Sequence, residues 1–465
     1  RQMCIRDRFY LSSIQLSMNV FPIISRRWNM VSQFLMIFTL VSIWISLIWG
    51  VVILVSGVHF WLKHSDFKVD KKALPYYPKV TIVVPAHNED VVIAQTAKAI
   101  LNLNYPHDKV ELLLFADNCS DSTYEECLSV QALPEYEGRN ITIINRKGTG
   151  GKAGVLNDAL KMAEGDYICI YDADAMPEKN ALYFLVKEVL KDPERRVAAF
   201  GRNKTRNAKQ NFLTRCINQE IVVTQRVHHV GMWHLFKIGR IPGTNFIIQT
   251  DFVKSIGGWR NGALTEDTDI SFKIMQSGKL IALAYNSEAF QQEPETLKSY
   301  YMQRKRWAKG NYEVVLSNFK HLFGKGNWRV KLEVANYSCI FFWFNGAIVL
   351  SDLIFFANVL AIVLHIFFPT VQIPFAFDAS NIYIAQLMLF NWLLMIGLYL
   401  LQINVALASQ FGQATSKQIW LAILSYFSYA QLFIIVSLDS LWSIIMDKVL
   451  HREGTTWVKT KRFAE

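Results

Sequence analysis

One nearly uncharged run, from Val31 to Leu62, constrains this chain more than any other feature, because it is long enough to cross a bilayer. A membrane-spanning helix needs about 20 consecutive apolar residues. The basic stretch Lys63–Lys72 follows the run, and positive charge favours the cytoplasmic side. We therefore predict a transmembrane helix over residues 31–62 of a multi-pass protein of the plasma membrane.

An N-terminal segment, residues 1–30, precedes this predicted helix. Its first seventeen residues begin without methionine and lead poorly into the sequence that follows. We expect Met18 to be the natural start. We therefore expect residues 1–17 to be non-native and to have no role in the function.

The C-terminal third is again dominated by apolar sequence, with long runs over Tyr337–Phe368, Ile382–Gln410 and Ile419–Met446. We predict a membrane region over residues 335–447 and a basic cytoplasmic tail over 448–465. The loop 369–381 has no Lys or Arg and is expected outside the cell. Three crossings that start in the cytoplasm cannot end there, so one run must hold two short crossings or lie partly in the membrane interface. We favour interfacial helices around residues 297–322.

Composition agrees with a chain that is part soluble and part membrane-embedded. Of its 465 residues, 52% are hydrophobic and 19% are charged. The net charge is +11, but Lys and Arg cluster beside the apolar runs, so membrane flanks explain the charge and no nucleic-acid partner is expected. The six cysteines form no CxxC pair, which favours a reducing compartment over a zinc site or a disulfide framework.

Two further sets of residues have a structural rather than a chemical interpretation. Asp352 and Asp439 lie inside apolar runs and are expected to face protein or a polar channel, because a lipid-facing carboxylate is costly. His228, His229 and His234 lack the spacing of common zinc sites and are expected at the surface or at an interface.

Between the apolar ends, residues 75–325 alternate short β-rich runs with helical segments. The predicted strands are 80–85, 110–116, 140–144 and 167–171, and the predicted helices include 91–101 and 122–131. Such alternation predicts an α/β domain with a mostly parallel sheet. Ligands of such sheets bind outside the carboxyl ends of the strands.

Polar residues follow three of these strands, in the segments Pro85–Asp90, Asp117–Asp121 and Asp172–Asp174. Each segment alone is also typical of a turn, but three in register indicate a site. In an extended segment Asp172 and Asp174 point to the same side and repel each other unless a cation lies between them. A hard cation such as Mg²⁺ or Mn²⁺ takes carboxylate oxygens together with substrate phosphates.

The glycine-rich stretch Gly148–Gly154 is not a P-loop, because Arg146 replaces its first glycine and Ala153 its Ser or Thr. We expect a flexible loop that presents Lys152 to a donor phosphate. A simple hairpin or turn is the alternative.

Two later motifs complete the candidate site. Thr265-Glu266-Asp267 opens a predicted helix, where acidic residues serve as caps or, in the functional interpretation, Asp267 is a general base. In the stretch Gln303–Trp307, a helix would put Gln303, Arg306 and Trp307 on one face. An amide, a fixed cation and an aromatic plane suit a diphosphate and a sugar at the mouth of a membrane pore better than a plain membrane anchor.

Taken in order, these motifs resemble those of the family 2 membrane-embedded processive glycosyltransferases, which include cellulose, hyaluronan, chitin and poly-N-acetylglucosamine synthases. The resemblance implies an α/β GT-A (Rossmann-like) domain over residues 75–325, on the cytoplasmic side and inserted between α-helical transmembrane segments. It also implies a role for each motif residue. Glu89 and Asp117 would hold the uracil or ribose, and Asp174, helped by Asp172, would bind the metal and the diphosphate. Asp267 would be the base. Gln303 and Arg306 would bind the diphosphate or the acceptor, and Trp307 would stack on the acceptor sugar.

The implied activity is inverting and processive. UDP-glucose or UDP-N-acetylglucosamine would be polymerised into a β-linked polysaccharide that leaves through the protein's own membrane region. The expected partners are the UDP-sugar, the growing polysaccharide, the lipid bilayer and accessory export proteins. A non-processive membrane transferase that adds one sugar to a lipid carrier is the alternative. A silent scaffold or channel is a third, which the intact carboxylate set disfavours.

Overall fold

The structure is a computed structural model, and it describes residues 34–64, 73–368, 382–410 and 414–450. The predictions for residues 1–17, for the rest of the N-terminal segment, for the loop 369–381 and for nearly all of the tail lie outside these residues. Contacts between residues divide the chain into two compact units. One comprises residues 51–338 with 399–465, and the other comprises residues 1–50 with 339–398.

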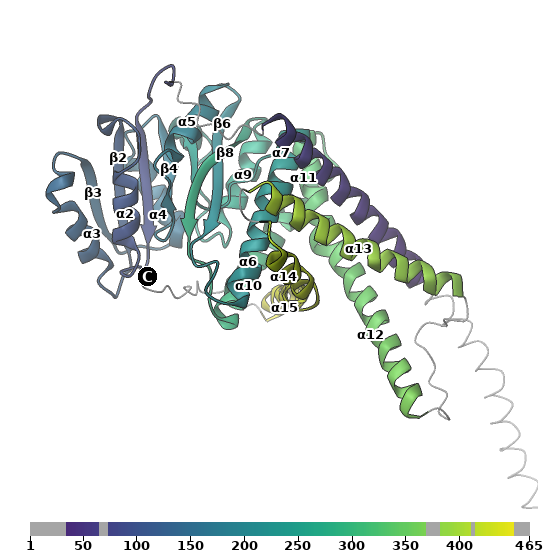
Figure 1. The fold of residues 1–465 in the computed structure, drawn as a ribbon. Helices are drawn as coiled ribbons and strands as arrows, with labels where there is room; N and C mark the ends of the chain where they lie inside the picture. The colour runs from purple at the N-terminus through teal and green to yellow at the C-terminus, as the bar shows by residue number, and fades with distance from the viewer. Residues whose placement is uncertain (1–33, 65–72, 369–381, 411–413, 451–465) are drawn as a thin grey trace, which may run out of the picture. The chain divides into compact units, whose positions relative to one another are not determined.

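The first unit is built on an 8-stranded sheet in the order β3-β2-β1-β4-β7-β6-β8-β5 (Figure 1). The strands are β1 Val80–Ala86, β2 Val110–Asp117, β3 Asn140–Arg146, β4 Tyr167–Ile170, β5 Met176–Pro177, β6 Arg196–Thr205, β7 Phe246–Gln249 and β8 Leu280–Gln291. The four predicted strands form one parallel half, β3-β2-β1-β4. The other half is mixed, because β7 runs antiparallel to both β4 and β6 while β6 and β8 are parallel.

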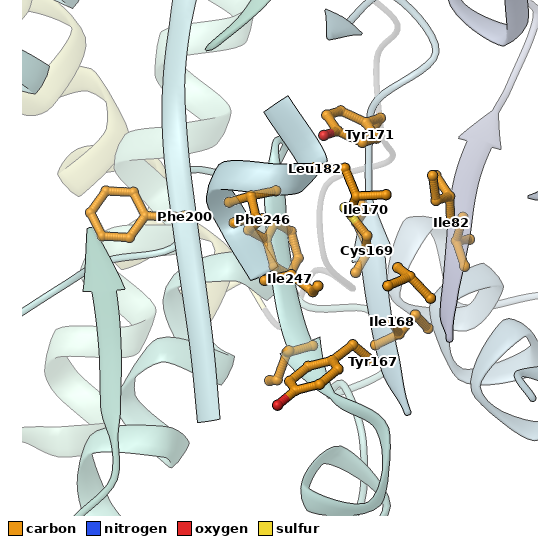
Figure 2. Close-up of a cluster of buried hydrophobic side chains, with 14 of the residues drawn as sticks. Ile82, Tyr167, Ile168, Cys169, Ile170, Tyr171, Leu182, Phe200, Phe246 and Ile247 are labelled. Carbon is orange, nitrogen blue, oxygen red and sulfur yellow. The ribbon is translucent and has the colours of Figure 1, made fainter. Parts of the chain in front are cut away.

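Strand composition explains the positions in the sheet. The apolar strands β1 and β2 are buried almost throughout and lie inside the sheet, as expected for parallel strands covered on both faces. Strand β3 is partly exposed and polar, and it forms an edge. Figure 2 shows the core at the junction between the parallel half and the mixed half of the sheet, where Cys169 and Ile170 of β4 lie near Phe246 and Ile247 of β7.

Helices cover this sheet and extend beyond it. They are α2 Ile93–Leu101, α3 Thr123–Gln131, α4 Gly151–Met162, α5 Ala181–Leu190, α6 Phe212–Val223, α7 Val230–Phe236, α8 Thr250–Ser255, α9 Glu266–Gln276, α10 Leu297–Asn318 and α11 Trp328–Ser338. A π-helical turn, η3 Thr224–His229, joins α6 to α7. The predicted helices 91–101 and 122–131 correspond to α2 and α3 within two residues.

Four helices among the described residues are long and apolar enough to cross a membrane: Phe34–Lys63, Trp328–Ser351, Phe390–Ala408 and Ser416–Val449. The first matches the run predicted over residues 31–62. The C-terminal helices are α12 Asn345–Phe367, α13 Ile382–Ala408, α14 Ser416–Phe427 and α15 Tyr429–Val449. The last apolar run is therefore two helices that meet at Ser428.

Candidate functional site

A cavity of about 800 Å³ lies at the carboxyl ends of β1, β2 and β4. This volume is within the range of about 300–1,000 Å³ that is usual for small-molecule sites. The cavity is lined by all nine residues that the sequence proposed: Glu89, Asp117, Lys152, Asp172, Asp174, Asp267, Gln303, Arg306 and Trp307. Motifs spread over more than two hundred positions of sequence thus meet at one place in the fold.

Two tight turns bring the first acidic residues to this edge of the sheet. Asn88 and Asn118 follow β1 and β2 with φ values of 54° and 51°, in the left-handed region that Asn tolerates. The turn after β1 is fixed to the next loop, because the backbone N–H of Glu89 donates to Thr123 Oγ1 at 2.7 Å. Glu89 and Asp117 are both only 7% exposed, so both carboxylates lie deep in the cavity wall.

Asp117 has an ion-pair partner that sequence reasoning did not assign. Arg146, at the end of β3, donates from Nη1 to Asp117 Oδ1 at 2.6 Å and from Nε to Asp158 Oδ2 at 2.8 Å. The parallel register explains the contact, since Asp117 and Arg146 are direct neighbours across β2 and β3. Arg146 therefore fixes the orientation of a carboxylate that lines the cavity.

Lys152 faces the cavity from a helix, so the prediction of a flexible loop around it was wrong. Gly150 and Gly151 have φ values of 89° and 58°, and α4 begins at Gly151, one residue before the lysine. Lys152 Nζ contacts Asp172 Oδ1 at 2.6 Å, Glu266 Oε1 at 3.2 Å and the carbonyl of Gly243 at 2.8 Å. The ammonium thus lies between carboxylates from two separate motifs and offsets their repulsion.

The Asp172–Asp174 segment is a turn rather than the extended segment that the sequence analysis assumed. Strand β4 ends at Ile170, and Ala175 N–H donates to the Asp172 carbonyl at 2.9 Å. Both aspartates still line the cavity. Among the described residues no three His, Cys, Asp or Glu side chains gather to hold a metal ion. A cation here fits only with further oxygen ligands from a substrate or water, which is how Mg²⁺ usually binds beside phosphates.

Asp267 lies in the first turn of α9 and has the altered acidity expected of a base. Burial and the neighbouring Glu266 carboxylate raise its pKa to about 7, against the opposing charges of Lys152 and Arg306. Its Oδ1 also accepts from the Thr268 N–H at 2.7 Å, so one carboxylate oxygen satisfies a backbone donor of the first helical turn. At this pKa the carboxyl can both accept and release a proton near neutral pH.

Helix α10 supplies the third wall of the cavity. It is helical throughout the predicted stretch, so Gln303, Arg306 and Trp307 do share one face, and all three line the cavity. Arg306 Nη1 donates to the Leu264 carbonyl at 3.2 Å, just before α9. Gln303 Oε1 is buried without a hydrogen-bond partner among the described residues, so it is available to a ligand.

The helices α9 and α10 approach each other closely at one glycine. A Cβ added at Gly310 would lie 2.5 Å from Thr265 Cγ2, a distance that no side chain can adopt. Gly310 therefore lets the backbone of α10 rest directly on the residue that precedes α9.

Sequence reasoning missed a cluster around Arg304, which also lines the cavity. Its Nη1 bonds Glu220 Oε1 of α6 at 2.6 Å, and its guanidinium lies 4.5 Å from the Trp307 ring centroid and 5.2 Å from that of Tyr300. Tyr429 of α15 donates to the other oxygen of Glu220. The cluster therefore places a paired cation against the Trp307 ring, a contact that favours one position of the indole.

His229 corrects another expectation. It lines the cavity from η3 and is half-buried rather than at the surface. Burial and the nearby Arg240 charge lower its pKa to about 3, so the imidazole is neutral at neutral pH. No signal in the sequence separates it from His228 or His234.

Comparisons with known proteins show the family and the fold of the chain. The sequence model of the family described as "Glycosyltransferase like family 2" matches residues 78–310. The chain is 31% identical over 423 residues to the "Probable glycosyltransferase YdaM" of Bacillus subtilis (strain 168), covering 90% of this chain and 96% of the relative.

Two relatives with named products are covered less fully. The chain is 30% identical over 240 residues to the beta-monoglucosyldiacylglycerol synthase of Trichormus variabilis, covering 51% of this chain and 49% of the relative. It is 26% identical over 265 residues to the poly-beta-1,6-N-acetyl-D-glucosamine synthase of Staphylococcus aureus (strain COL), covering 55% and 59%. The chain spans only about half of either relative.

One solved structure shares the fold. The mannosyltransferase PcManGT from Pyrobaculum calidifontis, in complex with GDP-Man and Mn²⁺, superposes with a TM-score of 0.54 at 17% sequence identity, over 85% of this chain and 99% of that chain. At this identity the likeness concerns the fold alone.

Proposed function

Since the chain belongs to the glycosyltransferase-like family 2 and has its GT-A fold, we propose that it polymerises a β-linked polysaccharide from a UDP-sugar. One observation carries this proposal. A single cavity contains both a carboxylate of raised pKa, Asp267, and an aromatic ring, Trp307, which has the Arg304 guanidinium 4.5 Å from its centroid. A polymerase needs both a base for each transfer and a surface that keeps the product bound between transfers.

In this proposal the donor binds against β1, β2 and β4. Glu89 and Asp117 hold the uracil or ribose, and the diphosphate lies near Lys152 at the N-terminal end of α4, where helix N–H groups favour anions. Asp172 and Asp174 would hold a Mg²⁺ or Mn²⁺ ion, which when bound offsets charge on the diphosphate. Lys152 contributes positive charge on the same side.

The transfer itself is a single displacement in this proposal. Asp267 takes the proton from an acceptor hydroxyl, and that oxygen forms a bond to the anomeric carbon of the donor sugar. The bond from this carbon to the diphosphate oxygen breaks, and UDP leaves with the electron pair. Attack from the face opposite to UDP converts an α-linked donor into a β-linked product, so one base is enough.

The acceptor end lies along α10 in the same proposal. Gln303 and Arg306 bind the diphosphate or the acceptor, and Trp307 stacks on the terminal sugar. The growing chain then leaves through the protein's own membrane region, from a catalytic unit on the cytoplasmic face of the plasma membrane, with accessory export proteins beyond it.

A second candidate function is the transfer of a single sugar to a lipid. It is favoured by the relative that is named beta-monoglucosyldiacylglycerol synthase, which shares 30% identity over 240 residues. Purified protein in nanodiscs, given labelled UDP-glucose or UDP-N-acetylglucosamine, separates the two functions. Polymer stays in the aqueous phase and increases in length, whereas a glycolipid enters the organic phase with one sugar added.

Trp307→Ala is expected to shorten the polymer and to weaken acceptor retention about tenfold. An aromatic contact contributes ~0.5–1.5 kcal/mol beyond area burial, and about 1.4 kcal/mol is a factor of ten in binding. Product length is measured by gel filtration after one donor addition. Trp328→Ala is the matched control, because Trp328 is 50% exposed and does not line the cavity. Unchanged length and yield for Trp307→Ala would remove the platform role.

The rate is expected to rise with pH through about 7, where Asp267 loses its proton. Below this pKa the carboxyl is protonated and cannot accept the acceptor proton, so kcat/KM should fall about tenfold per pH unit. The measurement is kcat/KM across neutral pH, with thermal unfolding recorded at each pH to separate titration from loss of fold. A flat profile would contradict the assignment of Asp267 as base.

A further inference from the structure

The apolar run Ser416–Val449 is a candidate span by composition. Its two helices lie beside α10 and α6 (Figure 1), and polar contacts attach them to these helices along the whole run. Four of its residues make these contacts, which we call the anchor contacts. They are Gln418 with Gln219 of α6 at 2.8 Å, Tyr429 with Glu220 of α6, Asp439 with Lys305 of α10 at 2.5 Å, and Asp447 with Lys309 of α10 at 2.7 Å.

The spacing of the anchor contacts leaves no segment that can span a bilayer. From one contact to the next the chain advances no more than about eleven residues, or about 17 Å of helix. The hydrocarbon core is ~30 Å thick. A crossing by α15 alone would put its middle residue, Asp439, at the centre of the bilayer. Lys305 and the other α10 residues beside it would then have to lie there too.

Helix α10 cannot lie at that depth. It carries Arg304, Lys305 and Arg306 in succession, lines the catalytic cavity and is not among the candidate spans. Each such charge is unfavourable at the centre of a bilayer. Because α15 is bonded to α10 at its midpoint and again at Asp447, it lies at the depth of α10.

The opposite face of α14 and α15 is apolar and exposed. Within each helix its side chains recur every three or four residues, and together they are called the apolar stripe: Trp420, Leu424 and Phe427 on α14, and Ile435, Leu438, Trp442, Ile445 and Val449 on α15. A helix with one polar, protein-bound face and one apolar face with Trp suits the boundary between lipid headgroups and acyl chains. Lipid is therefore the occupant that the composition of the stripe favours.

We infer that α14 and α15 lie on the membrane surface, with the apolar stripe in the lipid, and that neither crosses the bilayer. Three candidate crossings then remain: the N-terminal helix, the helical stretch that contains α12, and α13. Two of these crossings, α13 and the stretch that contains α12, follow the catalytic unit. The C-terminal tail therefore lies on the same side of the membrane as the catalytic unit. This removes the conflict between three C-terminal apolar runs and a basic cytoplasmic tail. The inference concerns membrane topology and stands whether or not the protein makes a polymer.

Cysteine labelling of the full chain in intact cells tests the inference. Ser416→Cys at the start of α14 and Lys448→Cys near the end of α15 are expected on the same side, both unlabelled by an impermeant maleimide until the membrane is opened. Ser380→Cys, in the loop expected outside, is the positive control, and the parent chain gives the background from native cysteines. Labelling of Lys448→Cys but not Ser416→Cys from outside would show that α15 crosses and would overturn the inference.

Lipid contact is tested separately by fluorescence quenching in bilayers with brominated lipid. Trp442 is 62% exposed on the stripe, and the difference between the parent chain and Trp442→Phe isolates its signal. We expect stronger quenching from bromine placed high on the acyl chain than from bromine near its end. Equal access for both, or none, would mean that protein covers the stripe or that α15 is inserted deeply, and either result contradicts a surface helix.

Discussion

Asp267→Asn is expected to lower the rate of sugar transfer by about 10²–10⁴-fold, the usual contribution of a positioned base. The amide has the shape of the carboxylate but cannot take a proton from the acceptor hydroxyl. Donor binding should persist, because Asp267 contacts the acceptor rather than the nucleotide in the proposed reaction. Initial rates of UDP release, together with calorimetric titration of the UDP-sugar, measure the two effects separately.

Asp251→Asn is the matched control for this variant. Asp251 also lies in the first turn of a short helix, α8, but it is exposed and does not line the cavity. We expect it to retain the parent rate. Near-normal transfer by Asp267→Asn would exclude Asp267 as the base. Its raised pKa would then be only a consequence of burial and of the Glu266 charge.

Removal of divalent metal with EDTA is expected to stop turnover, with the rate restored by Mg²⁺ or Mn²⁺. Asp174→Asn should lose most of the activity even at high metal concentration, because an amide oxygen is a weaker ligand for a hard cation. A second readout is the rise in Tm that UDP with Mn²⁺ gives, which we expect to be reduced in Asp174→Asn. This readout does not depend on catalysis.

Asp108→Asn serves as the control for metal binding, since Asp108 is exposed in the short 3₁₀ turn His107–Lys109 before β2 and lies outside the cavity. It should keep both the rate and the rise in Tm. Full activity in EDTA would mean that Asp172 and Asp174 do not act through a metal. Lys152 would then be the nearest source of positive charge for the diphosphate.

Local pattern was enough to predict the parallel half of the fold and the edge of the sheet at which the candidate residues meet. Apolar runs that end in polar turns are determined by neighbours in sequence, and parallel strands bring those turns to one edge. The helical face of Gln303 and Trp307 follows from spacing alone. For the same reason the resemblance to family 2 glycosyltransferases was correct at the level of family and fold.

Features that depend on distant contacts or on backbone detail could not be predicted. The Arg304–Glu220 pair joins residues 84 positions apart, and the Glu220–Tyr429 bond joins residues 209 positions apart. Hydropathy likewise does not show that Asp439 and Asp447 of the last apolar run pair with Lys305 and Lys309 of α10. The helix that carries Lys152 begins at Gly151 because Gly150 and Gly151 have positive φ. A glycine-rich sequence allows positive φ but does not show at which residue it occurs.

The contact between Gly310 and Thr265 has a consequence for the chemistry of the product. At this point α10 has no side chain of its own and contacts the Thr265 side chain directly, so this close packing helps to set the distance from Asp267 to Trp307. If Trp307 binds the terminal sugar, that distance selects the hydroxyl of the sugar that lies beside the base. The linkage position of the polymer would then be a property of how two helices pack. A larger residue at position 310 would be expected to change which hydroxyl reacts before it changed the donor that is used.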